Sequence, residues 1–202
     1  MRYFKILCTI MIVTIFFWSL KASAGISGSK HDFHSASWNT NGEICQPCHT
    51  PHNASTVEKP LWNHQLSTQS FTVYTSTTTD ATIGAPSASS KLCLSCHDGV
   101  TAIDNFGGRT DGVITMGSVG TGSGNLGTAL TNDHPVSFAY DAALFAADAG
   151  LKDPASAGIS PLLKSGKVEC SSCHDVHNTA NRSHLLVVSN ASSALCLTCH
   201  NK

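Results

Sequence analysis

One short pattern, Cys-x-x-Cys-His, occurs four times in the sequence, and its residue types and spacing are those that hold a haem. The paired thiols are Cys45 and Cys48, Cys93 and Cys96, Cys170 and Cys173, and Cys196 and Cys199. Two thiols at this spacing can add to the two vinyl groups of one porphyrin, and the pattern is the attachment signature of c-type haem. The adjacent histidine then binds the iron from one face of the ring. The sequence therefore predicts four haem c groups, with the proximal iron ligands His49, His97, His174 and His200.

Paired cysteines also build zinc sites and disulfide frameworks, but the pattern favours neither. Zinc prefers closed tetrahedral sets of Cys and His, and it does not require His directly after every second Cys. An exported chain with an even number of thiols often forms disulfides. Here, however, eight of the nine cysteines lie inside the four motifs, and the ninth, Cys8, lies in a segment that we expect to be removed. No thiol is left for a long-range disulfide.

The first 24 residues have the features of a signal peptide. Arg2 and Lys5 give a positive start, residues 6–20 are mostly apolar, and Ala22-Ser23-Ala24 resembles a signal-peptidase site. The apolar run is short for a membrane span and no second run follows, so we expect no span in the mature protein. We expect cleavage after residue 24 and export to the cell surface or the extracellular space, with the periplasm as the alternative. Export also suits haem attachment, which takes place outside the cytoplasmic membrane in c-type cytochromes.

The composition of residues 25–202 predicts a protein that depends on its cofactors for a core. Loss of Arg2, Lys5 and Lys21 with the signal peptide leaves nine of the 12 basic residues against 13 acidic ones, a formal charge of −4. This balance argues against nucleic acid as a partner, since nucleic acid favours a basic face. Large apolar residues are few, and such a chain would struggle to bury a core alone. Porphyrins offer large apolar faces, so folding should be coupled to haem binding, with little structure in the absence of haem.

We expect a mostly irregular, loop-rich fold with a few short helices and minor strand, organised around the haems. Residues 25–202 are predicted to form a single domain. The expected local elements are an extended arm over residues 25–44, a short strand over 71–74 and a Gly-rich loop over 107–127. The clearest helix lies within residues 141–150, because Asp starts it and Gly follows its end. Its Leu144 and Phe145 are expected to pack on a haem or on the core.

An internal repeat divides the four motifs into two pairs. Residues 45–53 match residues 170–178, and residues 88–97 match residues 191–200. Each pair is a CxxCHxxHN followed by an LCLxCH. We interpret the repeat as a duplication within one haem-bridged body, with halves at about residues 25–100 and 131–202 and the Gly-rich loop between them.

The second axial ligand of each iron decides what a haem protein can do. A haem with one protein ligand can bind a substrate or oxygen, whereas a haem with two mainly transfers electrons. The only methionine after the signal peptide is Met116, so at least three haems cannot take Met from their own chain. Seven histidines lie outside the motifs, which is enough for bis-His ligation throughout. The favoured distal ligands are His52, His64, His134 and His177, and the weaker candidates are His31, His34 and His184.

Position in the chain sets this ranking. His52 and His177 lie three residues after proximal histidines, too close to reach over the same porphyrin, so each suits an adjacent haem. The alternative for each is a surface histidine or one that binds a haem propionate. His64 and His134 lie beside a Trp and a Pro, in stiff settings that could present an imidazole. His184 gains some support because it follows His177 roughly as His64 follows His52.

Several motifs together resemble a known family. They are CQPCHTPHN, PLWNH, NDHPVSF, CSSCHDVHN and LCLTCHNK, and the resemblance covers most of the chain after residue 24, although the Gly-rich middle carries little of it. The combination is similar to the multihaem c-type cytochromes of metal-reducing bacteria. With four haems it resembles the outer-surface cytochrome E type, which polymerises into extracellular filaments. The resemblance implies bis-His haems in a continuous chain, in which one haem of each subunit takes a ligand from its neighbour.

The resemblance also implies partners and a linking residue. A related hexahaem filament joins its subunits through the distal His of its first CHxxH, which corresponds to His52 here. His31 lies in Ser29–Phe33, a stretch that also resembles the family, and is the other candidate. The expected partners are further copies of this chain, other redox cytochromes and extracellular electron acceptors such as metal oxides. A head-to-tail contact that does not close would give an open helical filament.

Three functions fit a tetrahaem chain, and the sequence favours an extracellular electron conduit. The first alternative is a soluble periplasmic shuttle of the cytochrome c3 kind, but those shuttles are commonly lysine-rich around their haems and this chain is lysine-poor. The second alternative is a multihaem reductase acting on nitrite or hydroxylamine, which needs an open haem. The cysteines are committed to haem, so no Cys/His nucleophile set is available. We therefore expect no enzymatic activity.

Overall fold

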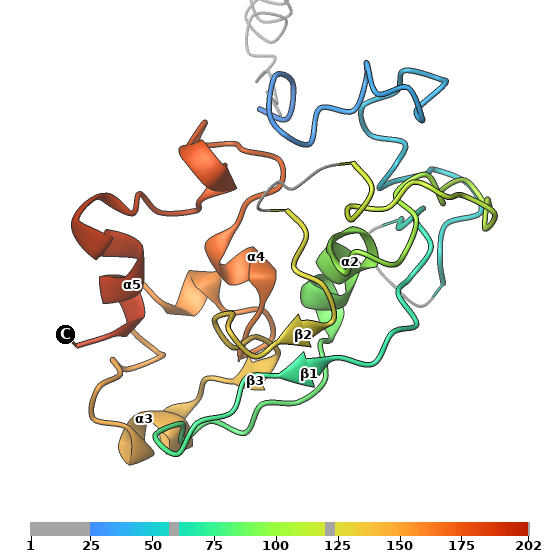
Figure 1. The fold of residues 1–202 in the computed structure, drawn as a ribbon. Coiled ribbons are helices and arrows are strands. Elements are labelled where there is room, and N and C mark those ends of the chain that lie inside the picture. Colours follow the sequence, from blue (N-terminus) through green and yellow to red (C-terminus); the bar gives the residue numbers. More distant parts are fainter. Residues whose placement is uncertain (1–24, 57–60, 120–123, 202) are drawn as a thin grey trace, which may run out of the picture.

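Loops connect a few short elements in the fold (Figure 1). The computed structural model describes residues 25–56, 61–119 and 124–201, so the expected signal peptide, residues 1–24, lies outside the described residues. In chain order the elements are β1 (Thr72–Val73), α2 (Ala88–His97), β2 (Ala129–Leu130), β3 (Phe138–Ala139), α3 (Ala142–Ala147), η1 (Ser160–Leu162), β4 (Lys167–Val168), α4 (Cys170–Cys173), η2 (Ser183–Leu185), η3 (Ala191–Ser193) and α5 (Ala194–Cys199). The prediction of a loop-rich fold with short helices and little strand is confirmed. No helix in the described part of the chain is long and apolar enough to cross a bilayer.

Two small sheets hold the loops in place. In one, β1 and β2 run parallel, with Thr72 opposite Ala129. In the other, β3 and β4 run antiparallel, with Phe138 opposite Val168. Figure 1 shows β1, β2 and β3 together along one side of the molecule, with α2 and α4 above them. The β1–β2 pair joins segments on either side of α2 and of the Gly-rich loop, so it fixes the position of the second motif relative to the rest.

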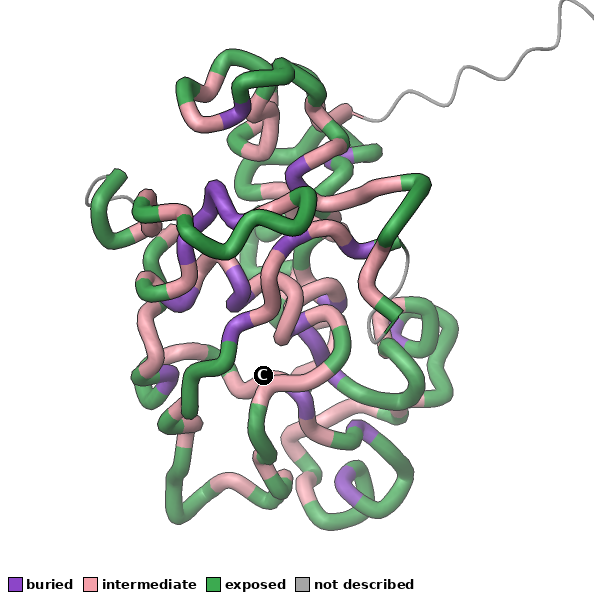
Figure 2. The backbone as a smooth tube through the Cα atoms, turned by 90° about the vertical axis from the view of Figure 1, so that its right-hand side faces the viewer, coloured by how far each residue is buried: buried purple, intermediate pink, exposed green. Residues whose placement is uncertain are grey.

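The apolar core of the described residues is small. Its buried cluster consists of Tyr140, Leu144, Ile159 and Val168. Figure 2 shows the buried positions as short stretches scattered among intermediate and exposed ones. The Tyr140 hydroxyl donates to the carbonyl of Lys152 at 2.7 Å, which satisfies the polar group of the cluster. A connected cluster of four buried side chains is slight for a chain of 202 residues, because chains of this size normally bury most of their apolar surface.

The predicted helix within residues 141–150 is confirmed, and it is shorter than expected. The Asp141 side chain accepts hydrogen bonds from two backbone N–H groups of the first turn, both at 3.0 Å, and so caps α3. Asp148 has φ −113° and ψ 100°, an extended conformation that ends the helix before the glycine. Leu144 is buried as expected, but Phe145 is 38% exposed and does not join the core. Successive helical residues point about 100° apart, so only one of the two can face the cluster.

The other local predictions hold in part. The expected strand over residues 71–74 is present as β1, and the described parts of residues 107–127 contain no helix or strand. The arm over residues 25–44 is irregular as expected, but it is coiled instead of extended. Its backbone N–H groups donate to carbonyls three residues earlier, as from Asp32 to Ser29 at 3.1 Å and from Ala36 to Phe33 at 3.1 Å. Glycine, serine and asparagine favour such turns, which explains the difference.

The two CxxCHxxHN segments have the same backbone arrangement. Each proximal histidine forms an isolated antiparallel bridge with a residue further along, in the pairs His49–Trp62 and His174–Leu186. Asn53 and Asn178, which end the two motifs, both have positive φ, 56° and 50° respectively. Asparagine tolerates this left-handed conformation better than most residues. The similarity of the two segments therefore extends from the sequence to the path of the chain.

Replacement of Ile159 by Ala tests the small core. Ile159 is the most deeply buried member of the cluster, with 1% of its surface exposed. Ile159→Ala should lower the free energy of unfolding of the haem-loaded protein by about 2–5 kcal/mol, because the substitution leaves a cavity. Val113→Ala is the matched control, at a position 80% exposed, where a change below about 0.5 kcal/mol is expected. Urea unfolding followed by circular dichroism measures both, and equal effects would contradict the assigned core.

Candidate haem sites

Each Cys-x-x-Cys-His motif forms one helical turn. The second motif lies at the end of α2, the third begins with α4, and the fourth lies at the end of α5. In the first motif the backbone N–H of His49 donates to the carbonyl of Cys45 at 2.8 Å, and the third and fourth motifs have the equivalent bond at 3.0 Å. Residues three and four positions apart share one face of a helix. The turn therefore presents both thiols and the proximal imidazole on the same side, as attachment of one porphyrin requires.

The eight cysteines of the described chain are free thiols, and neighbouring motifs in the sequence are neighbours in space. Cys93 of the second motif shares a hydrogen bond with Cys170 of the third, and this bond together with burial raises the pKa of Cys93. The nearby Cys48 of the first motif raises the same pKa further. Burial and the nearby Cys199 of the fourth motif raise the pKa of Cys173 in the third. The cysteines of all four motifs thus have neighbours in another motif.

Three proximal imidazoles each face an imidazole from a distant part of the chain. The ring centroids are 6.1 Å apart for His49 and His177, 6.0 Å for His97 and His31, and 6.4 Å for His200 and His134. Two imidazoles on opposite sides of one metal ion have their centroids roughly 6 Å apart, since each metal–nitrogen bond is about 2 Å and each centroid lies about 1 Å beyond its nitrogen. These three pairs therefore fit bis-His ligation of an iron.

His31 has a second feature of a metal ligand. Its Nδ1 atom is buried and has no hydrogen-bond partner in the described structure. Buried polar atoms are nearly always hydrogen-bonded, so an unpartnered ring nitrogen indicates a missing group. Burial, together with the neighbouring His97 and His174, lowers the pKa of His31 to about 4. The ring is therefore neutral at neutral pH, and the neutral imidazole is the form that binds a metal.

Four other imidazoles bond through Nδ1 to a backbone carbonyl. The carbonyl belongs to Gly124 for His97, to His184 for His174 at 2.9 Å, to Gln65 for His64 at 2.7 Å, and to Pro135 for His134 at 2.9 Å. Histidines that bind metals typically donate one ring N–H to a carbonyl or carboxylate, which fixes the ring. In this tautomer Nε2 is left as the nitrogen that can bind iron.

The four favoured distal candidates divide into two groups. His134 and His177 each lie opposite a proximal ring, as described above. His64 is buried, with 5% exposed, but its Nε2 lies 3.5 Å from the Sγ of Cys96 instead of opposite a proximal imidazole. His52 is exposed and makes no ring contact with another imidazole in the described structure.

The three weaker candidates also differ from one another. His31 is the one that the structure brings to a proximal ring, that of His97. His34 is exposed and pairs with the carboxylate of Asp32 at 2.7 Å. His184 is exposed, and its Nδ1 bonds to the hydroxyl of Ser183 at 2.8 Å. The geometry therefore favours His31 over the two histidines that the sequence ranked beside it.

The bridges also correct the alignment of the two halves beyond their motifs. Because Trp62 and Leu186 occupy equivalent bridge positions, the counterpart of His64 in the second half is Val188. By this register His184 does not occupy the place in the second half that His64 occupies in the first. The second half reaches its bridge one residue earlier than the first. Spacing in the sequence could not show which residue pairs with each proximal histidine.

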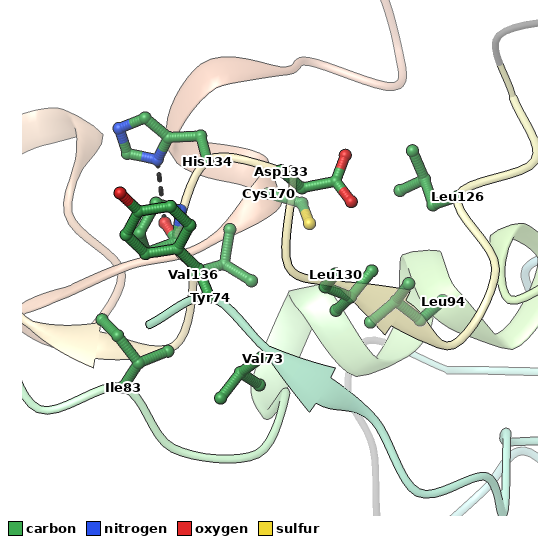
Figure 3. A pocket seen from close by; sticks show the side chains of 11 residues that line it. Val73, Tyr74, Ile83, Leu94, Leu126, Leu130, Asp133, His134, Val136 and Cys170 are labelled. Carbon is green, nitrogen blue, oxygen red and sulfur yellow. Dashed lines mark hydrogen bonds between the residues drawn. The ribbon is translucent and has the colours of Figure 1, made fainter. Parts of the chain in front are cut away.

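An apolar pocket lies beside the third motif (Figure 3). Its apolar walls include Val73, Ile83, Leu94, Leu126 and Leu130. Cys170 and His134 are the members of the lining that can bond to a haem. Cofactor sites are mostly apolar hollows with a few placed polar groups, and this small pocket shares that character.

Asp98 and Asp175 directly follow two proximal histidines, and the sequence patterns did not single them out. Asp98 is 1% exposed and accepts from two backbone N–H groups of the next turn, at 2.9 and 2.7 Å, and from the Ser67 hydroxyl at 2.6 Å. Asp175 accepts in the same way from backbone N–H groups of its own following turn, at 3.0 and 2.8 Å. Each carboxylate fixes the chain where it leaves a motif. The sequence feature that could have identified these two residues is the Asp that directly follows CxxCH in two of the four motifs.

Comparison with protein families gives a match over residues 162–202, which hold the third and fourth motifs, to the doubled CXXCH motif. No curated protein matches the chain. The family match points to a multihaem c-type cytochrome, and such motifs bind haem c for electron transfer. The match does not distinguish the filament-forming type from other multihaem cytochromes.

Replacement of Asp98 by Asn should reduce stability in a pH-dependent way. Burial opposes ionisation of Asp98, but hydrogen bonds from Ser67, Thr101 and the following backbone outweigh it and hold the pKa below its ordinary 3.8. A carboxyl group with a depressed folded-state pKa stabilises the protein above its unfolded-state pKa, and this contribution is lost as the pH falls through the folded-state pKa. The difference in free energy of unfolding between wild type and Asp98→Asn should be constant above about pH 5 and shrink below about pH 4.

Urea unfolding of the haem-loaded proteins across this pH range measures the difference. Asp80→Asn, at an exposed position, is the control and should follow the wild type at each pH. A stability difference for Asp98→Asn that does not change with pH would contradict an ionised carboxylate at this position.

Proposed function

We propose that the chain is a tetrahaem electron-transfer protein in which every iron is ligated by two histidines. When bound, haem c supplies one-electron exchange between ferric and ferrous iron. The observation that carries the proposal is the set of three imidazole pairs with centroids 6.0–6.4 Å apart. With an imidazole on both sides of an iron, no position is left for a substrate, so we also propose that the protein has no enzymatic activity.

In this proposal each distal ligand comes from a segment remote from its motif. His177 serves the first motif, His31 the second and His134 the fourth. The eight motif cysteines form the thioether bonds, and the four motif histidines are the proximal ligands. The contacts that support this assignment are the ring pairs and the carbonyl bonds at Nδ1.

We further propose that the third motif takes its distal ligand from a neighbouring copy of the chain. No imidazole of the described residues stands opposite His174 as one does at the other three motifs. His52 is exposed, and it occupies the place in the first half that His177 occupies in the second. Since His177 lies opposite the proximal ring of the first motif, the same relation assigns His52 of one copy to His174 of the next. A contact of this kind, repeated without closing, gives an open filament.

The proposed filament lies outside the cell and carries electrons outward. Residues 1–24, which resemble a signal peptide, support export. The acidic balance of the remaining residues argues against a nucleic-acid partner. The proposed partners are further copies of the chain, other redox cytochromes and extracellular acceptors such as metal oxides. A soluble periplasmic shuttle is the alternative, and the state of assembly distinguishes the two.

Replacement of His31 by Ala should open one haem in four. His31→Ala should leave the number of thioether-linked haems unchanged, because the attachment cysteines are intact. One iron should lose its second ligand, giving a high-spin ferric signal in electron paramagnetic resonance and binding of carbon monoxide by the reduced protein. His34→Ala, in the same arm but exposed and paired with Asp32, is the control and should remain low-spin. A fully low-spin His31→Ala protein would reject this ligand assignment, and wild type without thioether-linked haem would reject the function.

Replacement of His52 by Ala should weaken the joining of subunits. The variant should keep all its attached haems, since His52 lies outside the motifs. Electron microscopy of the secreted fraction should show filaments for the wild type and short oligomers or single particles for His52→Ala. His184→Ala, which removes another exposed histidine, should leave filaments intact. Discrete wild-type particles would favour the soluble shuttle, and normal filaments from His52→Ala would exclude His52 as the link.

A further inference from the structure

Glu169 is a buried carboxylate between the second and third motifs. It is 1% exposed, and it directly precedes Cys170. Its oxygens accept hydrogen bonds from the hydroxyls of Ser87 at 3.3 Å, of Ser137 at 2.8 Å and of Ser90. The backbone N–H of Ser172 donates to the same side chain as part of a capping box. None of the ion pairs in the described part of the chain includes Glu169.

The groups around Glu169 can all act as hydrogen-bond donors to its carboxylate. The Ser90 oxygen accepts from the backbone N–H of Cys170 at 3.0 Å, and the Ser137 oxygen accepts from the backbone N–H of Ser87 at 2.9 Å. Each of these hydroxyls keeps its own proton, which it can donate to the carboxylate oxygen beside it. An ionised carboxylate accepts only, which matches a site where every surrounding group donates.

The same bonds place the charge close to two attachment sites. Ser90 lies on α2, three residues before Cys93, and Glu169 lies at the start of α4. The Ser89 and Ser171 hydroxyls add a bond of 2.6 Å between the same two helices. Cys93 and Cys170 meet at this junction. The serines and Glu169 therefore join the second and third motifs through a buried polar contact that carries one negative charge.

We propose that Glu169 lowers the reduction potentials of the haems attached at the second and third motifs relative to the other two. The inference rests on the proposed haem binding at these motifs. A buried negative charge acts through a low effective dielectric, so it stabilises ferric iron, the more positive state, over ferrous iron. Net charge and solvent exposure around a centre are among the factors that set its potential. Glu169 is thus a positioning residue that also biases where electrons reside along the chain of haems.

Replacement of Glu169 by Gln tests the charge while keeping the shape. In a spectroelectrochemical titration, two of the four macroscopic midpoint potentials should shift to more positive values and the other two should change little. Glu169→Asp keeps the charge and disturbs the packing, so its potentials should stay near those of the wild type. Glu43→Gln is the matched control, since Glu43 precedes the first motif by two residues but is exposed, where water and salt screen its charge.

Haem content and spin state, measured on the same samples, separate this inference from the function that it rests on. Four low-spin haems with unchanged potentials in Glu169→Gln would overturn the role of Glu169 and leave the proposed function standing. If Glu169→Gln fails to assemble, Ser87→Lys places an ammonium group beside the intact carboxylate at a half-buried position. A positive shift of two potentials in Ser87→Lys then supports the inference, and no shift overturns it.

Discussion

Two imidazoles that share one metal ion must face each other across a fixed gap, and much of this structure can be traced to that requirement. The pair His49–His177 joins the first motif to the third, and His31–His97 folds the arm over residues 25–44 back onto α2. His134–His200 brings the segment before β3 to the end of α5. The sheets are two-stranded and the apolar cluster has four members. Sheets and apolar packing therefore contribute little to holding distant segments of the chain together. In the proposed haem-loaded protein, pairs of histidine ligands take the place that strands and large side chains have in other folds.

The sequence alone was sufficient for the parts of the structure that depend on local chemistry. The attachment motifs form helical turns because their spacing is that of one turn, and Asp141 caps α3 as its position predicts. Long-range relations could not be obtained in this way. His31 was among the weaker distal candidates, and its pairing with the ring of His97 depends on how the arm over residues 25–44 folds back. His64 lies in a distinctive sequence motif, yet its ring faces Cys96.

The duplicated segments show how similar sequences can serve different roles. His52 and His177 occupy equivalent places, but one is exposed and the other faces a proximal ring. The second half also reaches its bridge to the proximal histidine one residue sooner than the first half does. At the junction of the halves, contact between α2 and α4 is made by serines and Glu169 where an apolar contact would be usual. The repeat therefore accounts for the local structure of the motifs. The differences between the halves determine the path of the chain between one motif and the next.

The His49–His177 pair has a consequence for the unfolded chain. Their positions in the sequence are 128 residues apart, so an iron held between them would close a very long loop. By the chain-entropy estimate used for disulfides, a cross-link closing a loop of this size disfavours the unfolded state by about 5 kcal/mol. With the proposed ligation, a chain with so small an apolar cluster would resist unfolding because iron cross-links it. Unlike a disulfide, such a link is opened by acid, because protons compete with iron for the imidazole nitrogens.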